Sequence, residues 1–202
     1  MSSTMYSTPS GSVTEQWERI ARWLLTNLES PSIAGADAAE IDSAQQATGV
    51  SWPAELTTLF EHLNGFPPAA HVALLPMHEM FSLDRAVEER AMELDIWGEF
   101  DEEMGAPDPD AAAGDTAGTY IPAFVPFAGA DGYLLVVDAR PGPLHGCVTE
   151  FEKVDTDSAG PRWVSISAML TDLADSLETG AEFDMGWTPV VADGRLEWRS
   201  RT

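Results

Sequence analysis

The chain has 202 residues, with thirty-four acidic and ten basic side chains, and a formal net charge of −24. A surface of this sign repels nucleic acid and anionic membranes and attracts basic proteins, so neither nucleic acid nor a membrane is expected as a partner. The single cysteine, the absence of a long apolar run and the absence of a secretory signal pattern together favour a cytoplasmic protein.

Three helices are predicted in the first third of the chain. Residues 1–11 are rich in Ser and Thr and are expected to be a disordered tail. Apolar residues at helical spacing predict a helix over residues 12–28 and a weaker one over 37–49. Trp52-Pro53 places a proline at the first position of a third helix, which is expected to end at Asn64-Gly65.

The middle of the chain changes character twice. Residues 72–75 are predicted to form a short strand or an extended piece, and Ser82 is expected to cap a further helix. Helical periodicity is lost from residue 97 to residue 118, where seven carboxylates occur among Pro, Gly and Ala without a basic residue. These features predict a flexible acidic insertion over 97–118.

Short apolar runs at residues 122–127, 133–137 and 148–151, separated by turn residues, predict an antiparallel meander. Ser165 and Gly180 have the character of residues that begin and end a last helix.

A β-hairpin is expected after this helix, because Asp193-Gly194 lies between two short apolar runs. The predicted fold class is therefore α+β, with one mainly antiparallel sheet flanked by helices. The predicted organisation is a tail over 1–11, one domain over 12–180 with the insertion over 97–118, and a hairpin extension over 181–202.

No motif for catalysis, a cofactor or a metal stands out. Phosphate-binding loops are absent from the sequence, and the histidines lack metal-ligand spacing. Cys147 and His145 would share one face of a strand, and a thiolate beside an imidazolium is a catalytic device. A lone cysteine in an apolar run is more often a small buried hydrophobic residue. We therefore expect no enzyme, no cofactor and no metal, with a thiol enzyme as the alternative.

The acidic insertion has two interpretations. It can be a solvated surface, or it can attract a basic partner and accelerate association. Trp97 has two interpretations of its own, an interface anchor or a residue that packs inward at a helix end. The candidate partner-binding residues are Trp97, Glu99, Phe100, Asp101, Glu102, Glu103 and Asp131.

The order of several motifs resembles the SUKH superfamily, which groups the fungal Smi/Knr cell-wall regulators and many bacterial immunity proteins. The resemblance covers residues 14–180. It is carried by the segments 17–24, 37–49, Trp52-Pro53-Ala54-Glu55-Leu56, Leu63-Asn64-Gly65, 75–83, Ile121-Pro122-Ala123-Phe124-Val125-Pro126-Phe127, 132–138, 146–151 and 165–177.

This resemblance implies an α+β binding protein without catalysis. In bacteria, similar proteins neutralise secreted toxins, which are often nucleases; in fungi, similar proteins are scaffolds for wall synthesis and signalling. Together with the charge, it predicts an immunity protein that binds a basic toxin domain. The alternative is a scaffold or regulator of cell-wall synthesis or signalling.

Overall fold

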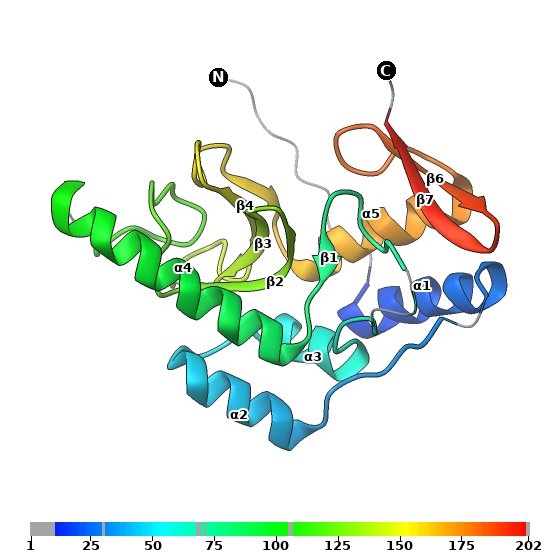
Figure 1. Ribbon diagram of the computed structural model, residues 1–202, viewed down its shortest axis with the longest axis horizontal. Helices are drawn as coiled ribbons and strands as arrows, with labels where there is room; N and C mark the ends of the chain where they lie inside the picture. Colours follow the sequence, from blue (N-terminus) through cyan, green and yellow to red (C-terminus); the bar gives the residue numbers. More distant parts are fainter. Residues whose placement is uncertain (1–10, 30, 68–69, 71, 105–106, 201–202) are drawn as a thin grey trace.

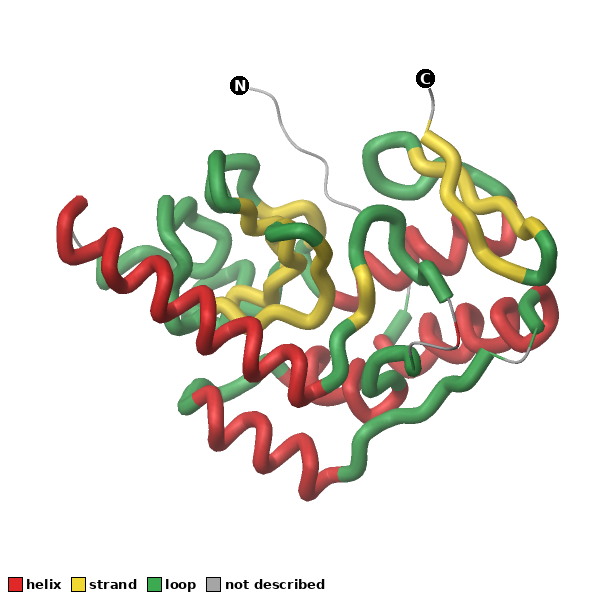
Figure 2. Tube along the Cα trace, viewed as in Figure 1, coloured by secondary structure: helices red, strands yellow, loops and turns green. Residues whose placement is uncertain are grey.

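The computed structural model describes residues 11–29, 31–67, 70, 72–104 and 107–200, and of residues 101–104 it describes the backbone alone. These residues form helices packed around a five-stranded sheet, with a two-stranded hairpin beside them (Figures 1 and 2). The helices are α1 (Val13–Asn27), α2 (Ala38–Thr48), α3 (Ala54–His62), α4 (Leu83–Met104) and α5 (Ile166–Thr179). The strands are β1 (Glu79–Met80), β2 (Phe124–Ala130), β3 (Tyr133–Asp138), β4 (Val148–Glu152), β5 (Pro161–Trp163), β6 (Trp187–Ala192) and β7 (Arg195–Ser200). The α+β prediction is confirmed.

Helix starts follow local chemistry. Ser12 and Glu15 form a capping box before α1, and Asp37 and Glu40 form one before α2. In each box, a side-chain oxygen and a carboxylate accept backbone N–H groups that no helical carbonyl can reach. The third helix differs slightly from its prediction, because Pro53 is the N-cap of α3 and Ala54 is the first helical residue.

The sheet is an antiparallel meander in the order β1-β2-β3-β4-β5. Residues 72–75 take the second of the two predicted forms, an extended piece outside the sheet, and the edge strand β1 lies at Glu79–Met80, paired with Ala128 and Gly129 of β2. Leu74 and Leu75 belong to a connecting segment, and their side chains are buried in the core. Apolar burial alone does not distinguish such a segment from a strand.

The core lies between the sheet and the helices. α1, α3 and α5 pack on one another, whereas α4 lies on β2 and contacts α2 (Figure 1). Phe127, Leu56 and Leu170 are almost completely buried. Burial of each such side chain contributes roughly 1.5–3 kcal/mol of transfer free energy to folding.

The loss of helical periodicity predicted at residue 97 is wrong, because α4 continues to Met104. The Trp97 ring packs edge-on against Phe151, with ring centres 5.3 Å apart, and its indole donates a hydrogen bond to Glu93. These contacts extend the inward face of α4. The many polar residues in this part of the helix interrupt the apolar pattern by which such a face is recognised in a sequence. Trp97 therefore packs inward, as one of its two interpretations expects, but from within α4 and not at a helix end.

The segment after α4 is tied to the sheet between residues 114 and 118. Two buried carboxylates accept its backbone N–H groups: Asp138 binds Gly114 at 2.9 Å, and Asp157 binds Ala117 at 2.7 Å and Gly118 at 2.9 Å. Hydrogen bonds from backbone donors to buried carboxylates are strong, so this part of the predicted insertion is fixed in place.

The chain closes with the β6–β7 hairpin, whose turn is Asp193-Gly194. Trp198 of β7 donates its indole N–H to the Ala73 carbonyl at 2.8 Å, and its ring packs on Phe183. Arg162 binds Asp184 at 2.5 Å, which holds the segment before the hairpin against β5. The predicted tail over 1–11 lies outside the described residues except for Gly11.

Candidate binding surface

Three cavities lie next to one another across α2, α4, the β2–β3 turn and the segment around β1. The α2–α4 cavity has a volume of about 600 Å³, the central cavity about 530 Å³, and the β1 cavity about 660 Å³. Glu88 lines both the α2–α4 cavity and the central cavity, and Asp131 lines both the central cavity and the β1 cavity. The three cavities therefore form one continuous surface, which we call the acidic face.

The acidic face has a strong charge imbalance. Its lining includes seven carboxylates, at Asp37, Glu40, Glu79, Asp84, Glu88, Glu89 and Asp131. Among the described lining residues, the arginine and lysine side chains are those of Arg85 and Lys153, and both lie in the central cavity. A negative surface with hollows concentrates field lines and attracts positively charged partners.

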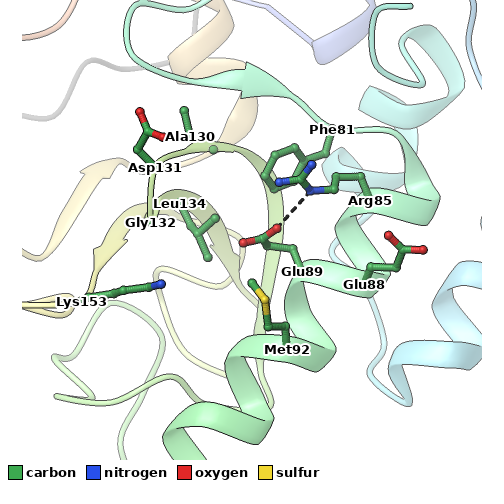
Figure 3. Close-up of a pocket in the computed structure, with 11 residues that line it drawn as sticks. Phe81, Arg85, Glu88, Glu89, Met92, Ala130, Asp131, Gly132, Leu134 and Lys153 are labelled. Carbon is green, nitrogen blue, oxygen red and sulfur yellow. Dashed lines mark hydrogen bonds and ion pairs between the residues drawn. The ribbon is translucent and has the colours of Figure 1, made fainter. Parts of the chain in front are cut away.

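The central cavity is built by three chain segments (Figure 3). α4 supplies Arg85, Glu88, Glu89 and Met92, whose spacing of three and four residues places them on neighbouring parts of one helix surface. The β2–β3 turn and Lys153, which follows β4, lie opposite the helix in Figure 3. The pairing of β3 with β4 brings the turn and Lys153 together.

One cation of the central cavity is already paired. Arg85 Nε binds the Glu89 carboxylate at 3.0 Å, and its guanidinium lies 5.2 Å from the centre of the Phe81 ring. Lys153 has no hydrogen bond or ion pair among the described residues, although its charge partly opposes the rise in the pKa of Glu93 that burial causes. Lys153 is exposed and remains able to bind an external group.

The β2–β3 turn fixes Asp131 at the junction of two cavities. Asp131 and Gly132 have φ angles of 53° and 87°, as a tight two-residue hairpin turn requires. Asp tolerates this left-handed region better than most residues, and Gly has no side chain to oppose it. The carboxylate of Asp131 is therefore held out from the end of the sheet, as Figure 3 shows.

The two outer cavities combine carboxylates with apolar surface. Small residues, Ala44, Ala47 and Val87, line the α2–α4 cavity. The β1 cavity includes Met77, whose side chain is 63% exposed. His78 beside it is neutral at pH 7, because burial lowers its pKa to about 4. An interface core of apolar residues with a charged rim is the usual anatomy of a protein-binding surface.

The structure separates the predicted site residues into two groups. Asp131 belongs to the acidic face, while Trp97 and Phe100 pack together on the later part of α4 with ring centres 5.6 Å apart. Phe100 is 53% exposed and Glu99 is exposed, so both are accessible. The predicted residues Asp101, Glu102 and Glu103 continue α4, and their side chains lie outside the described part of the chain.

Several residues of the face were not predicted from the sequence, among them Asp84, Glu88, Met92 and Lys153. The spacing of Asp84 and Glu88 on a predicted helix is a signal that could have shown them on one exposed surface. The position of Lys153 depends on strand pairing and carries no local signal.

Cys147 does not have the surroundings of a catalytic thiol. It is completely buried, and burial raises its thiol pKa to about 11. His145 is exposed and its Nδ1 lies 2.9 Å from the Arg140 carbonyl, which gives it a partner other than the thiol. The geometry therefore does not support the thiol-enzyme alternative, since the thiolate is the reactive form.

Within the described residues there is no group of three or more His, Cys, Asp or Glu side chains placed to hold a metal, and no helix long and apolar enough to cross a membrane.

Comparison with known proteins supplies the family. No curated protein matches the chain. The family model of the SMI1 / KNR4 family (SUKH-1) matches residues 35–178. That family includes immunity proteins and cell-wall regulators, and its members are generally non-catalytic proteins that bind partner proteins. The predicted resemblance is confirmed: the chain belongs to the SMI1 / KNR4 family (SUKH-1).

Proposed function

We propose that this protein is a cytoplasmic immunity protein that neutralises a toxin by stoichiometric binding of a basic toxin domain through the acidic face. The observation that carries the proposal is the continuity of three hollows with seven carboxylates and two cations. Family membership supports a protein partner, and the buried thiol fits a reducing compartment.

The charge of the face suits fast capture of a toxin. Complementary charge accelerates the encounter of two proteins and fixes their orientation, while the apolar residues within the hollows supply the contacts that keep the proteins together. Many nucleases present a basic substrate site, so a nuclease domain is a toxin class that this face would cover. Inhibition then requires only occupancy of the site and no chemistry by the immunity protein.

Charge-neutralising variants test the proposal. The double variant Asp84→Asn with Glu88→Gln removes two exposed carboxylates from the face. The matched control, Glu18→Gln with Glu197→Gln, removes two exposed carboxylates from α1 and β7. If a toxin gene lies next to this gene, its toxin domain is the partner in this test; affinity is measured by calorimetry at several salt concentrations.

The face variant is expected to lower affinity by roughly tenfold at low salt and to reduce the salt dependence, while the control leaves both almost unchanged. Equal effects of the two variants would show that the charge acts only as a general field. Absence of a complex at low salt, together with wall-stress sensitivity of a deletion strain, would favour the cell-wall regulator instead.

A further inference from the structure

The two cations of the acidic face are gathered in its central cavity. Arg85 and Lys153 line that cavity, whereas the described lining of each outer cavity contains carboxylates and no arginine or lysine. His78 adds no charge to the β1 cavity at pH 7, because burial lowers its pKa to about 4. Across the face the charge therefore changes from negative to mixed and back to negative.

Within the central cavity, Lys153 is the cation that is open to an external group. Both side chains are exposed, but Arg85 is paired with Glu89 at 3.0 Å, whereas Lys153 makes no ion pair among the described residues. Lys153 also approaches the turn closely, since a Cβ on Gly132 would lie 3.3 Å from its Cε. Its ammonium thus lies in the hollow between α4 and the Asp131 turn, as Figure 3 shows.

We infer that the central cavity receives a carboxylate of the partner at Lys153, and that this carboxylate is flanked in the partner by basic side chains that reach the two outer cavities. The inference rests on the proposed function and specifies its partner: a basic surface with one acidic residue at its centre. An ion pair between Lys153 and a partner carboxylate at the centre of the interface fixes the relative position of the two proteins, which general attraction between opposite charges does not fix. It also rejects a partner that is uniformly basic, which would place a cation against Lys153.

General attraction and a specific pair make opposite predictions at Lys153. Neutralising a lysine makes the protein more acidic, so general attraction predicts tighter binding of any basic partner. A specific pair predicts weaker binding of a partner that carries the central carboxylate. Arg22, an exposed cation of α1, provides a matched control for the change in net charge.

The probes are arginine-based peptides without lysine, N-acetylated, in which one glutamate is moved along the sequence, each paired with its glutamine counterpart. The wild-type protein, Lys153→Gln and Arg22→Gln are compared by calorimetry or fluorescence anisotropy at low salt. The wild type and Arg22→Gln are expected to bind the best glutamate peptide roughly threefold to tenfold more tightly than its glutamine counterpart. Lys153→Gln is expected to lose this preference, and the glutamine peptide then binds at least as well.

A chemical footprint gives a second readout without a variant, because Lys153 is the only lysine of the chain. Acetylation of amines by an N-hydroxysuccinimide ester should slow severalfold at Lys153 when the glutamate peptide is bound, with the α-amino group as internal reference. A denaturant unfolding curve shows whether Lys153→Gln is folded, since its charge also acts on Glu93; Lys153→Met replaces it if it is not.

Binding of every peptide by Lys153→Gln as tightly as or more tightly than by the wild type, with no preference for glutamate in the wild type, would overturn the inference and leave the proposed function intact. If no basic peptide or toxin binds, or if the Asp84→Asn and Glu88→Gln double variant binds as the wild type does, the proposed function itself fails.

Discussion

The indole Nε1 of Trp97 donates a hydrogen bond to the carboxylate of Glu93 at 3.1 Å, one helical turn earlier on α4. Glu93 is almost completely buried, and this burial raises its pKa above the ordinary value of 4.5, although Lys153 and the indole partly oppose the change. The folded state therefore binds a proton at Glu93 more readily than the unfolded state does. Its contribution to stability is fully present below about pH 4.5 and is lost as the pH rises through the folded-state pKa.

Glu93→Gln should remove this pH dependence. Glutamine keeps an oxygen that can accept from Trp97 and carries no charge to desolvate. We expect the variant to be more stable than the wild type at pH 7, with the difference disappearing toward pH 4.5. Urea unfolding at several pH values measures it. A less stable variant at pH 7 would show that attraction to Lys153 outweighs the cost of burial.

Asp157→Ala should release the segment that follows α4. The substitution removes the buried carboxylate that accepts from the N–H groups of half-buried Ala117 and exposed Gly118, and a hydrogen bond to a charged group contributes about 1.5–3 kcal/mol. We expect a loss of about 2–4 kcal/mol in the free energy of unfolding. Asp155→Ala, at an exposed neighbour, should change it by less than about 0.5 kcal/mol.

Hydrogen exchange separates this explanation from a general loss of stability. The amides of Ala117 and Gly118 should exchange much faster in Asp157→Ala than those of β3. Retained protection of both amides would show that another acceptor within the protein replaces the carboxylate and that the segment stays in place.

The β2–β3 turn allows charge and backbone shape to be tested separately. Asn tolerates the left-handed φ of Asp131, so Asp131→Asn should change stability by less than about 0.5 kcal/mol while it lowers partner affinity. Gly132→Ala forces a side chain into φ 87° and against Lys153, which should cost about 1–2 kcal/mol.

Gly98→Ala is the control for the added methyl group. Gly98 lies within α4 with open space around its Cβ position, so alanine should stabilise the protein by up to about 1 kcal/mol. Thermal unfolding measures the stability of the three variants, and calorimetry measures their affinity for the partner. An equal loss of stability in Asp131→Asn and Gly132→Ala would contradict the proposed role of the turn.

Much of the fold was readable from local signals. Ser12, Asp37 and Ser165 mark helix starts by their capping chemistry, and Asp193-Gly194 marks a hairpin. The sequence does not indicate the strand Pro161–Trp163, because three residues of mixed burial give no alternation of apolar and polar side chains. The end of α4 was misplaced because the inward contact of Trp97 with Phe151 joins residues far apart in the sequence.

The candidate surface was less readable for the same reason. The sequence predicts Asp131 as a site residue, but helix packing and strand pairing bring its neighbours Glu88 and Lys153 to it. Tyr133 pairs with Glu152, which places Lys153 beside the turn, and no local pattern predicts that register. Net charge indicated the kind of partner, but the distribution of charge over one face required the tertiary structure.

His78 should make the protein sensitive to mild acid. Its Nδ1 lies 3.1 Å from the Pro76 carbonyl, its Nε2 has no hydrogen-bond partner in the part of the chain that the structure describes, and burial lowers its pKa from 6.5 to about 4. The stability gained from a neutral His78 is fully present above pH 6.5 and is lost as the pH falls through about 4. The loss amounts to at most about 3.5 kcal/mol, since one pKa unit corresponds to about 1.4 kcal/mol.

His78→Asn keeps a donor near the Pro76 carbonyl and removes the titrating ring, so it should lose less stability than the wild type between pH 6.5 and pH 4.5. His145→Asn, at an exposed histidine, should follow the wild-type curve. Denaturant unfolding at both pH values measures the difference, and an NMR titration of the His78 ring measures its pKa directly. A His78 resonance that titrates near pH 6.5 would mean that the ring is solvated or paired with Glu150, whose carboxylate lies 4.0 Å from Nε2, and the acid sensitivity would then have another origin.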